Sequence, residues 1–218
     1  IWTQYSPTIR YLFCMGKVTG ANFEILEKIV DTLIVDVFEM LNRETSGVFY
    51  LPEETGEIPI YIIGEGVNDL TLEFEIIHDK TISSPEIDGE YIPKEGVVVL
   101  QIVYNPNENI KNVIEEITPE VYEVLTHEVV HFLQEEAGFE FPEKEPKKSL
   151  KYYKQKHEIE AQVKGFEKQS QVTKKDIRNT MENWFEKYPH KHNLTKKEVQ
   201  KLIKLLLKNY DKSKKSDR

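Results

Sequence analysis

Two histidines and a glutamate in the middle of the chain have the types and the spacing of a metal site. Residues 127–131 read HEVVH, so His127 and His131 are four positions apart. Side chains four apart on a helix lie on one face, where two imidazoles can bind the same metal ion. Glu128 is rotated by about 100° around the helix axis, which places its carboxylate beside the metal. There it can accept a proton from a water molecule, so the motif predicts metal-assisted hydrolysis.

The surrounding residues predict a largely buried helix of about five turns. Thr118 suits the N-cap, Pro119 the first helical position, and Gly138 a stop after the last turn. The apolar residues between them are Val121, Val124, Leu125, Val129, Val130, Phe132 and Leu133. A surface helix with two solvated histidines is the alternative interpretation. Buried histidines need polar partners, and a metal ion is one such partner.

A catalytic zinc site has three protein ligands and a water molecule, so one further ligand is needed. No histidine follows closely before His157, and the single cysteine, Cys14, lies far upstream. Carboxylates are plentiful, and the best candidates fall in a helical pattern at residues 156–166. Its apolar stripe is formed by Ile159, Val163 and Phe166.

Glu158 and Glu160 in this segment project about 200° apart, so they cannot share a role. Glu158 lies on a face with small residues that let a second helix approach, whereas Glu160 lies on a charged face. These neighbours are Ala161, Gln162 and Gly165 for Glu158, and Lys156, Lys164 and Glu167 for Glu160. We therefore choose Glu158 as the third ligand, with Glu160 next and an ordinary surface glutamate as the alternative interpretation.

HEVVH, 26 intervening residues and a glutamate on a second helix resemble the glutamate-ligand branch of the zincin metallopeptidases. The phrase HEIEA at residues 157–161 is similar to the third-ligand helix of short zincin-type peptidases of bacteria and their phages. The resemblance covers about residues 118–168. It implies zinc bound by His127, His131 and Glu158, with Glu128 as general base and a protein or peptide as substrate. Thermolysin-like members carry an aspartate four residues after the ligand glutamate, but this chain has Gln162 there, which puts that assignment in doubt.

Several other polar residues are weaker candidates. Tyr152, Tyr153 and His157 lie near the ligand glutamate in sequence, and one of them could stabilise an oxyanion, although Tyr152 is more readily a core residue. Gln134 falls on the same stripe as the histidine pair and could hydrogen-bond a ligand or the next helix, a structural rather than a catalytic role. His190 and His192 could form a second metal site, but histidines in a lysine-rich linker are usually solvated.

Length, composition and charge set the broad class. The chain has 218 residues and one cysteine, which excludes an intramolecular disulfide and fits a reducing, cytoplasmic location. No apolar stretch is long enough to span a membrane and no signal peptide is visible; the chain begins without Met, as a trimmed chain would.

The charge is divided unequally along the chain. Residues 1–170 carry −17 and residues 171–218 carry +8. Nucleic acid is therefore disfavoured as a partner of residues 1–170, the acidic body. Residues 171–218, the basic tail, could bind nucleic acid, and the alternative interpretation of the tail is a solvated helix.

The predicted elements precede and follow the metal helix. Asn22 can cap a helix to about residue 43, with a stripe of Leu26, Val30, Leu33, Val37 and Leu41. Strands are expected at residues 48–51, 58–63, 70–77 and 97–103, with a loop or short hairpin at 79–96. Two further helices are expected at about 173–187 and 195–210, the second capped by Thr195, with frayed residues 211–218.

These elements predict an α+β, zincin-like fold: an N-terminal helix, a small mixed sheet, the metal-binding helix and a helical C-terminal part. We expect an N-terminal lobe at 1–117, the metal-site helices at 118–170 and a basic extension at 171–218. In the zincin family the last strand before the metal helix is an edge strand that binds substrate. A buried core strand is the alternative for residues 97–103. The C-terminal helices should dock on the acidic body through Trp184, Leu202 and Leu206.

The function that follows is zinc-dependent hydrolysis of peptide bonds, more readily by an endopeptidase. Two alternatives stay open. One is a non-proteolytic binding or structural protein that keeps a zincin fold. The other is an interaction module that acts through its basic helical tail.

Overall fold

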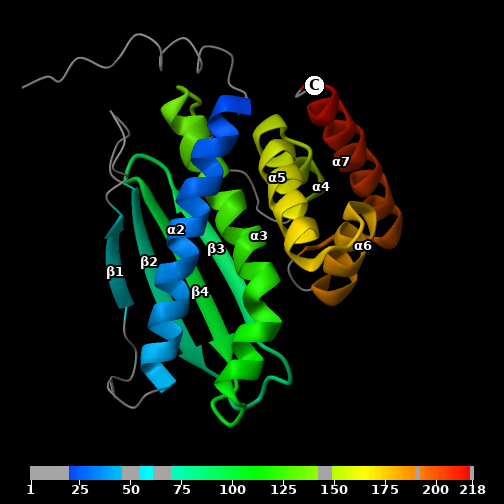
Figure 1. Ribbon diagram of the computed structural model, residues 1–218. Helices are drawn as coiled ribbons and strands as arrows, with labels where there is room; N and C mark the ends of the chain where they lie inside the picture. The colour runs from blue at the N-terminus through cyan, green and yellow to red at the C-terminus, as the bar shows by residue number, and fades with distance from the viewer. Residues whose placement is uncertain (1–19, 46–54, 61–69, 142–148, 190–191, 217–218) are drawn as a thin grey trace, which may run out of the picture. The chain divides into compact units, whose positions relative to one another are not determined.

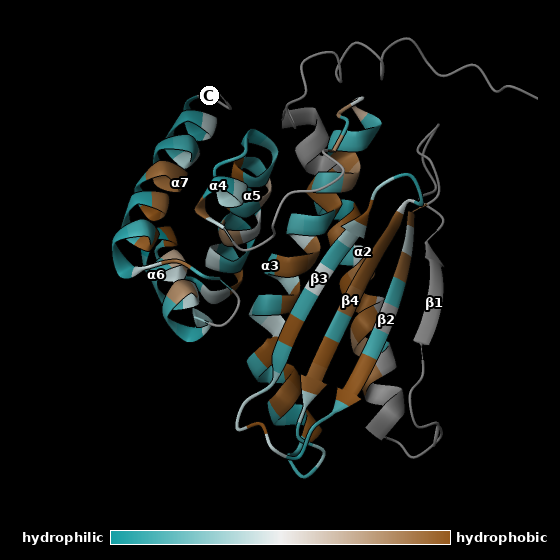
Figure 2. Ribbon diagram, turned by 180° about the vertical axis from the view of Figure 1, so that it is seen from behind, coloured by the Kyte–Doolittle hydropathy of each residue, from teal (hydrophilic) through white to brown (hydrophobic). Residues whose placement is uncertain are grey.

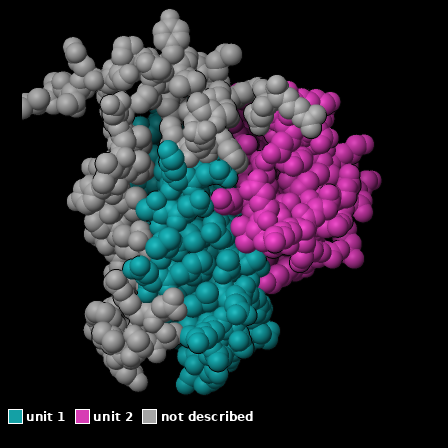
Figure 3. All heavy atoms as spheres, viewed as in Figure 1, with its two compact units in different colours: residues 1–139 teal, residues 140–218 magenta. Residues whose placement is uncertain are grey.

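The chain is a mixed α/β protein that divides into two compact units, residues 1–139 and residues 140–218 (Figure 3). The computed structural model describes residues 20–45, 55–60, 70–141, 149–189 and 192–216. The division after residue 139 places the segment 140–170 with the C-terminal helices, whereas the sequence grouped it with the N-terminal body. No helix in these ranges is both long enough and apolar enough to span a membrane.

Unit 1 begins with α2, Gly20–Thr45. The predicted stripe of five residues is buried along its whole length, from Leu26 to Leu41. The helix begins two residues before Asn22, so the prediction that Asn22 caps it is wrong.

Four strands follow: β1 (Thr55–Ile60), β2 (Leu70–His78), β3 (Glu86–Ile92) and β4 (Val97–Tyr104). Their order in the sheet is β1-β2-β4-β3, with β2 parallel to β4 and the outer strands antiparallel to their neighbours. Both α2 and α3 (Ile110–Glu136) lie on one face of this sheet (Figures 1 and 2). The expected strand at 48–51 lies outside the described residues, as do residues 61–63 of the expected strand 58–63.

The strand that precedes α3 is an inner strand. In β4, Val98, Leu100 and Ile102 are fully buried, and the strand is brown along most of its length in Figure 2. The expectation of a substrate-binding edge strand at residues 97–103 is therefore wrong, and the core-strand alternative is confirmed. The two edge strands are β1 and β3, and β3 lies within a segment that was expected to be a loop or short hairpin.

Helix α3 begins earlier than predicted. Asn109 is its N-cap, and its side chain accepts a hydrogen bond from the backbone N–H of Lys111 at 3.0 Å. Pro119 lies inside the helix, and the hydroxyl of Thr118 donates to the carbonyl of Ile114, so the predicted cap is wrong.

The C-terminal end of α3 is where the sequence placed it. Gly138 adopts a left-handed conformation with φ of 82°, and the N–H of Phe139 donates to the carbonyl of Gln134. This pattern is a Schellman motif, in which the residue after the helix adopts a left-handed conformation. Glycine adopts that conformation without steric cost because it has no Cβ.

Unit 2 is helical in its described residues, with α4 (Leu150–Tyr153), α5 (Lys156–Thr173), α6 (Ile177–Lys187) and α7 (Lys196–Ser216). Its core joins α5, α6 and α7 through Val163, Phe166, Met181, Phe185, Leu202 and Leu206, and Trp184 packs against it. The apolar residues of the last two helices thus dock on α5.

Thr195 caps α7 as predicted. Its N–H and hydroxyl both donate to the carboxylate of Glu198, and these hydrogen bonds, with the nearby Lys201, lower the pKa of that carboxyl. The helix continues to Ser216, so the predicted fraying of residues 211–216 is wrong.

Candidate metal centre

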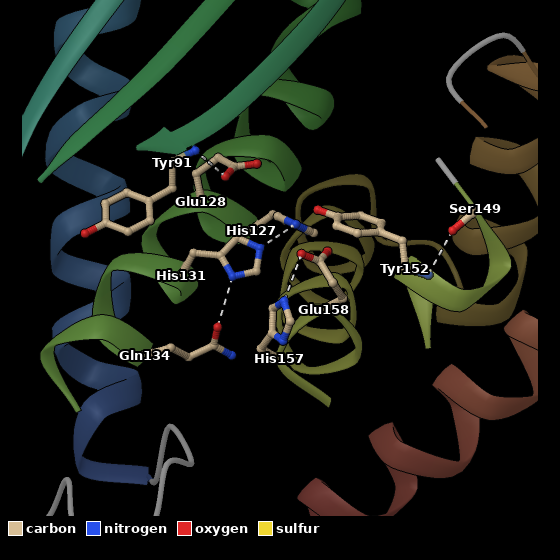
Figure 4. Close-up of polar contacts among 9 residues, drawn as sticks. All are labelled: Tyr91, His127, Glu128, His131, Gln134, Ser149, Tyr152, His157 and Glu158. Carbon is tan, nitrogen blue, oxygen red and sulfur yellow. Dashed lines mark hydrogen bonds and ion pairs between the residues drawn. The ribbon is translucent and has the colours of Figure 1, made fainter. Parts of the chain in front are cut away.

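His127 and His131 point the same edge of their rings at one another from successive turns of α3 (Figure 4). Their two Nε2 atoms are 3.1 Å apart. Two nitrogen ligands of one tetrahedral zinc ion, each about 2.0–2.1 Å from it, would be about 3.3 Å apart. The pair therefore fits a single metal ion without rearrangement of the helix. Together with Glu128, the two histidines form a group whose potential ligand atoms lie within 4.8 Å of one another.

Gln134 fixes the orientation of His131. Its Oε1 lies 2.9 Å from Nδ1 of His131, and both side chains are buried. An amide oxygen only accepts, so Nδ1 is the protonated nitrogen and Nε2 keeps its lone pair for a metal. A hydrogen-bond acceptor at the second ring nitrogen orients a metal-binding histidine, and of the two partners expected for Gln134 the structure shows the histidine.

Glu128 is held by the edge strand. One oxygen of its carboxylate accepts a hydrogen bond from the backbone N–H of Tyr91 in β3 at 2.8 Å (Figure 4). Tyr91 is opposite Val98 in β4, and in an antiparallel ladder alternate residues direct their N–H and C=O groups away from the neighbouring strand. The N–H of Tyr91 therefore points away from β4, and the carboxylate of Glu128 accepts its hydrogen bond at the outer edge of β3, close to the histidine pair.

Gly89 allows this close approach between β3 and α3. A Cβ at this position would lie 2.3 Å from Cγ1 of Val124 and 3.3 Å from Cγ of Glu128. Gly89 is two residues before Tyr91, so both lie on the helix-facing side of the strand. A larger residue would force the strand away from the helix that carries the motif.

Glu135 joins the same strand to the last turn of α3. Its carboxylate accepts hydrogen bonds from the hydroxyl of Tyr91 and from the backbone N–H of Lys94 at 2.9 Å. Burial, followed by the hydrogen bond to Glu135 and the charges of Glu135 and Glu136, raises the pKa of the Tyr91 hydroxyl. Tyr91 is therefore bound to α3 at both its backbone and its side chain.

Glu158 lies in the first turn of α5 and is 3 % exposed, whereas Glu160 is half-buried. Nε2 of His157 is 3.5 Å from the carboxylate of Glu158. Glu158 belongs to unit 2, and its pairing with the histidines of unit 1 stays a prediction. Gln162, one turn further on, is 4 % exposed, and its amide has no hydrogen-bond partner among the described residues.

The face of Glu160 is not the solvated surface that the sequence indicated. Lys164 and Glu167 are both buried, and they form an ion pair with a distance of 3.3 Å between Nζ and Oε2. Lys214 of α7 also pairs with Glu167. This contact comes from a helix that lies about 50 positions further along the chain, so helical periodicity within α5 could not show it.

The remaining candidates are structural in unit 2. Tyr153 belongs to the core cluster, with Tyr152 packed partly against it, so Tyr153 is the more buried of the two. His192 is buried, and its ring nitrogens bond the carbonyl of Phe185 at 3.0 Å and the N–H of Leu194 at 3.3 Å. It is therefore neither solvated nor available as a ligand, and His190 lies outside the described residues.

Sequence reasoning missed the residues of β3 and the end of α3 that hold Glu128. Tyr91, Gly89 and Glu135 come from different elements, and no local spacing relates them. The alternation of Ile87, Gly89 and Tyr91 was the available signal, because it places three residues on one face of a strand.

Comparison with known proteins gave no match: no family model, no curated protein and no solved structure is significantly similar to this chain.

Proposed function

We propose that this protein is a zinc-dependent peptidase in which His127 and His131 bind the metal. The observation that carries the proposal is the convergence of their Nε2 atoms at 3.1 Å. Gln134 supports it, because its bond to Nδ1 of His131 selects the tautomer that a metal requires. A histidine-rich site of tetrahedral geometry suits zinc.

Glu158 is proposed as the third ligand. What supports it over Glu160 is its burial in the first turn of α5, since a carboxylate held away from water needs a cation or a hydrogen bond. The zincin-like fold of unit 1 is part of the same proposal. Its support is the element order of helix, small sheet with an antiparallel edge strand, and motif helix.

Zinc held by these residues would polarise a substrate carbonyl and make water a better nucleophile. Glu128 is the general base, and it accepts the proton of the attacking water and passes it to the leaving amine. The N–H of Tyr91 holds one oxygen of this carboxylate, so the other is directed to the proton transfer. The open edge of β3 would align an extended peptide by backbone hydrogen bonds.

A second candidate is a binding or structural protein that keeps the fold without hydrolysis. Gln162 favours it, because it stands where the thermolysin-like enzymes carry an aspartate, and its buried amide has no partner among the described residues. An amide is a weaker acceptor than a carboxylate and orients a histidine less strongly.

Metal content tests the site. Protein purified without chelator and supplied with zinc should hold about one ion per chain, and His127→Ala or His131→Ala should abolish binding. Glu158→Ala should weaken binding strongly, whereas the matched Glu160→Ala should not. Absence of bound metal in the wild type would refute the site, and the reverse order of the two glutamate variants would refute the ligand assignment.

Cleavage of a broad peptide library tests the activity. Glu128→Gln should retain zinc and fold but lose hydrolysis, because an amide cannot accept the proton. Equal cleavage by wild type and Glu128→Gln would rule out this mechanism. A wild type that binds zinc but cleaves no peptide would favour the binding protein.

A further inference from the structure

The outward face of α7 carries a continuous row of lysines, here called the lysine row. Its members are Lys197, Lys201, Lys204, Lys208, Lys212 and Lys215. Consecutive members are three or four positions apart, and all six are exposed. At 1.5 Å per residue the row extends for about 27 Å. It is thus a linear array of positive charges of nearly the length of the helix.

The opposite face of α7 is occupied by the core of unit 2. Leu202 and Leu206 are fully buried against α5 and α6. With about 100° per residue, the six lysines fall within an arc of about 80° that points away from these leucines. The apolar face is therefore not available to insert into a membrane or to fill a groove on another protein.

The lysine row is not neutralised by its surroundings. Like charges three and four apart repel and destabilise a helix, so solvated helices usually mix lysine with glutamate. Among the described residues no member of the row forms an ion pair, whereas Lys214 on its flank pairs with Glu167. The two acidic residues of α7 offset little of this charge: Glu198 lies near Lys201 but is hydrogen-bonded to Thr195, and Asp211 borders the row further along.

This concentration of lysine is specific to unit 2. Residues 140–218 hold 22 Lys+Arg and 12 Asp+Glu, a net charge of +10. Residues 1–139 hold 7 and 26, a net charge of −19. The lysines of α7 therefore form a purely positive surface in a chain that is acidic elsewhere. Their mutual repulsion destabilises the helix, and a polyanionic partner would offset that repulsion.

We propose that the lysine row binds the phosphate backbone of double-stranded nucleic acid without sequence preference. A narrow, straight row matches a linear polyanion better than the plane of a lipid bilayer. Lysine binds phosphate as a point charge and reads no base edges. The one aromatic residue of α7, Tyr210, packs against the core cluster, so the row lacks the stacking platform of single-strand binders. The proposal is independent of the metal centre.

Contact with about four phosphates would give a slope of about −3.6 for the logarithm of affinity against the logarithm of salt concentration. Affinity should then fall by about 150-fold between 50 and 200 mM salt. A row that extends for about 27 Å has room for this number of phosphates.

The test measures binding of the full chain to a random-sequence 20-base-pair DNA duplex by fluorescence anisotropy at several salt concentrations. The test variant changes Lys201, Lys204, Lys208 and Lys212 to Gln, which favours helix and removes four charges. The matched control removes four exposed cations outside α7 by changing Lys156, Lys175, Lys187 and Arg178 to Gln. Circular dichroism of both variants verifies that the helices are retained.

We expect the test variant to lose at least about tenfold in affinity at 50 mM salt and most of the salt slope, and the control to change the slope by less than about 1. Three outcomes would overturn the proposal. They are absence of duplex binding by the wild type at 50 mM salt, equal losses in both variants, and tighter binding to anionic lipid vesicles or to polyglutamate than to the duplex.

Discussion

Gly89→Ala should destabilise unit 1, although the backbone at Gly89 does not exclude alanine. Where alanine fits both the backbone conformation and the space, replacing glycine gains about 0.4–1 kcal/mol, because the unfolded chain loses freedom. At Gly89 the added Cβ would lie 2.3 Å from Cγ1 of Val124 and 3.3 Å from Cγ of Glu128. The first distance is impossible without movement, and overpacking of this kind costs about 1–3 kcal/mol. We therefore expect a lower free energy of unfolding, by about 1–2 kcal/mol net.

The double variant Gly89→Ala/Val124→Ala isolates the cause. Val124→Ala alone removes two half-buried carbons and should cost about 1 kcal/mol. In the double variant the clash with Cγ1 of Val124 is absent. The double variant should therefore be about 1–2 kcal/mol more stable than the sum of the two single destabilisations predicts. Urea denaturation followed by far-ultraviolet circular dichroism gives all four free energies.

Hydrogen exchange reports whether the strand moves. The amide of Tyr91 donates to Glu128, and in Gly89→Ala it should exchange faster than in the wild type, while the double variant restores protection. Unchanged or increased stability of Gly89→Ala, or strictly additive costs, would show that β3 does not approach α3 as closely as described.

Three further predictions concern residues around the motif. Gln134→Ala should weaken zinc binding by about 10–100-fold in a competition titration, because His131 loses its orienting partner, whereas Gln134→Glu keeps an acceptor and most of the affinity. Tyr91→Phe should lower the free energy of unfolding, measured by urea denaturation, by about 1.5–3 kcal/mol, because a hydrogen bond to the carboxylate of Glu135 is lost. Since burial and the hydrogen bond to Glu135 raise the pKa of the Tyr91 hydroxyl, the difference in unfolding free energy between wild type and Tyr91→Phe should be constant from about pH 6 to about pH 10 and decline only at higher pH; a difference that falls between pH 6 and 8 would contradict this. Gly138→Ala should cost about 1–2 kcal/mol of unfolding free energy, because its φ of 82° is left-handed, and an unchanged midpoint would exclude this stop.

The sequence alone determined those features that depend on local geometry. Helical periodicity places His127 and His131 on one face, and the structure brings their Nε2 atoms together. The buried stripe of α2, the stop at Gly138 and the cap at Thr195 follow in the same way. In each of these features, neighbouring members lie within about one or two turns of one another, and the covalent chain sets their separation.

The predicted start of α3 was wrong because the sequence offers two suitable N-caps. Thr118 and Pro119 form a suitable helix start, yet Asn109 is the cap. A proline inside a helix loses one hydrogen bond, and packing of the longer helix on the sheet outweighs that loss. Val113 and Ile117, both buried, belong to the part of α3 that this packing added.

Only the tertiary structure decided which groups surround the motif. β3 takes the edge of the sheet, and its backbone N–H reaches Glu128 across 37 positions of sequence. Glu167 is buried and pairs both with Lys164 of its own helix and with Lys214 of α7. These contacts depend on close packing between elements distant in the chain, and packing is set by shape and volume rather than by residue spacing. A sequence pattern therefore locates the histidines and their neighbour Gln134, whereas the strand that holds Glu128 is decided by the assembled core.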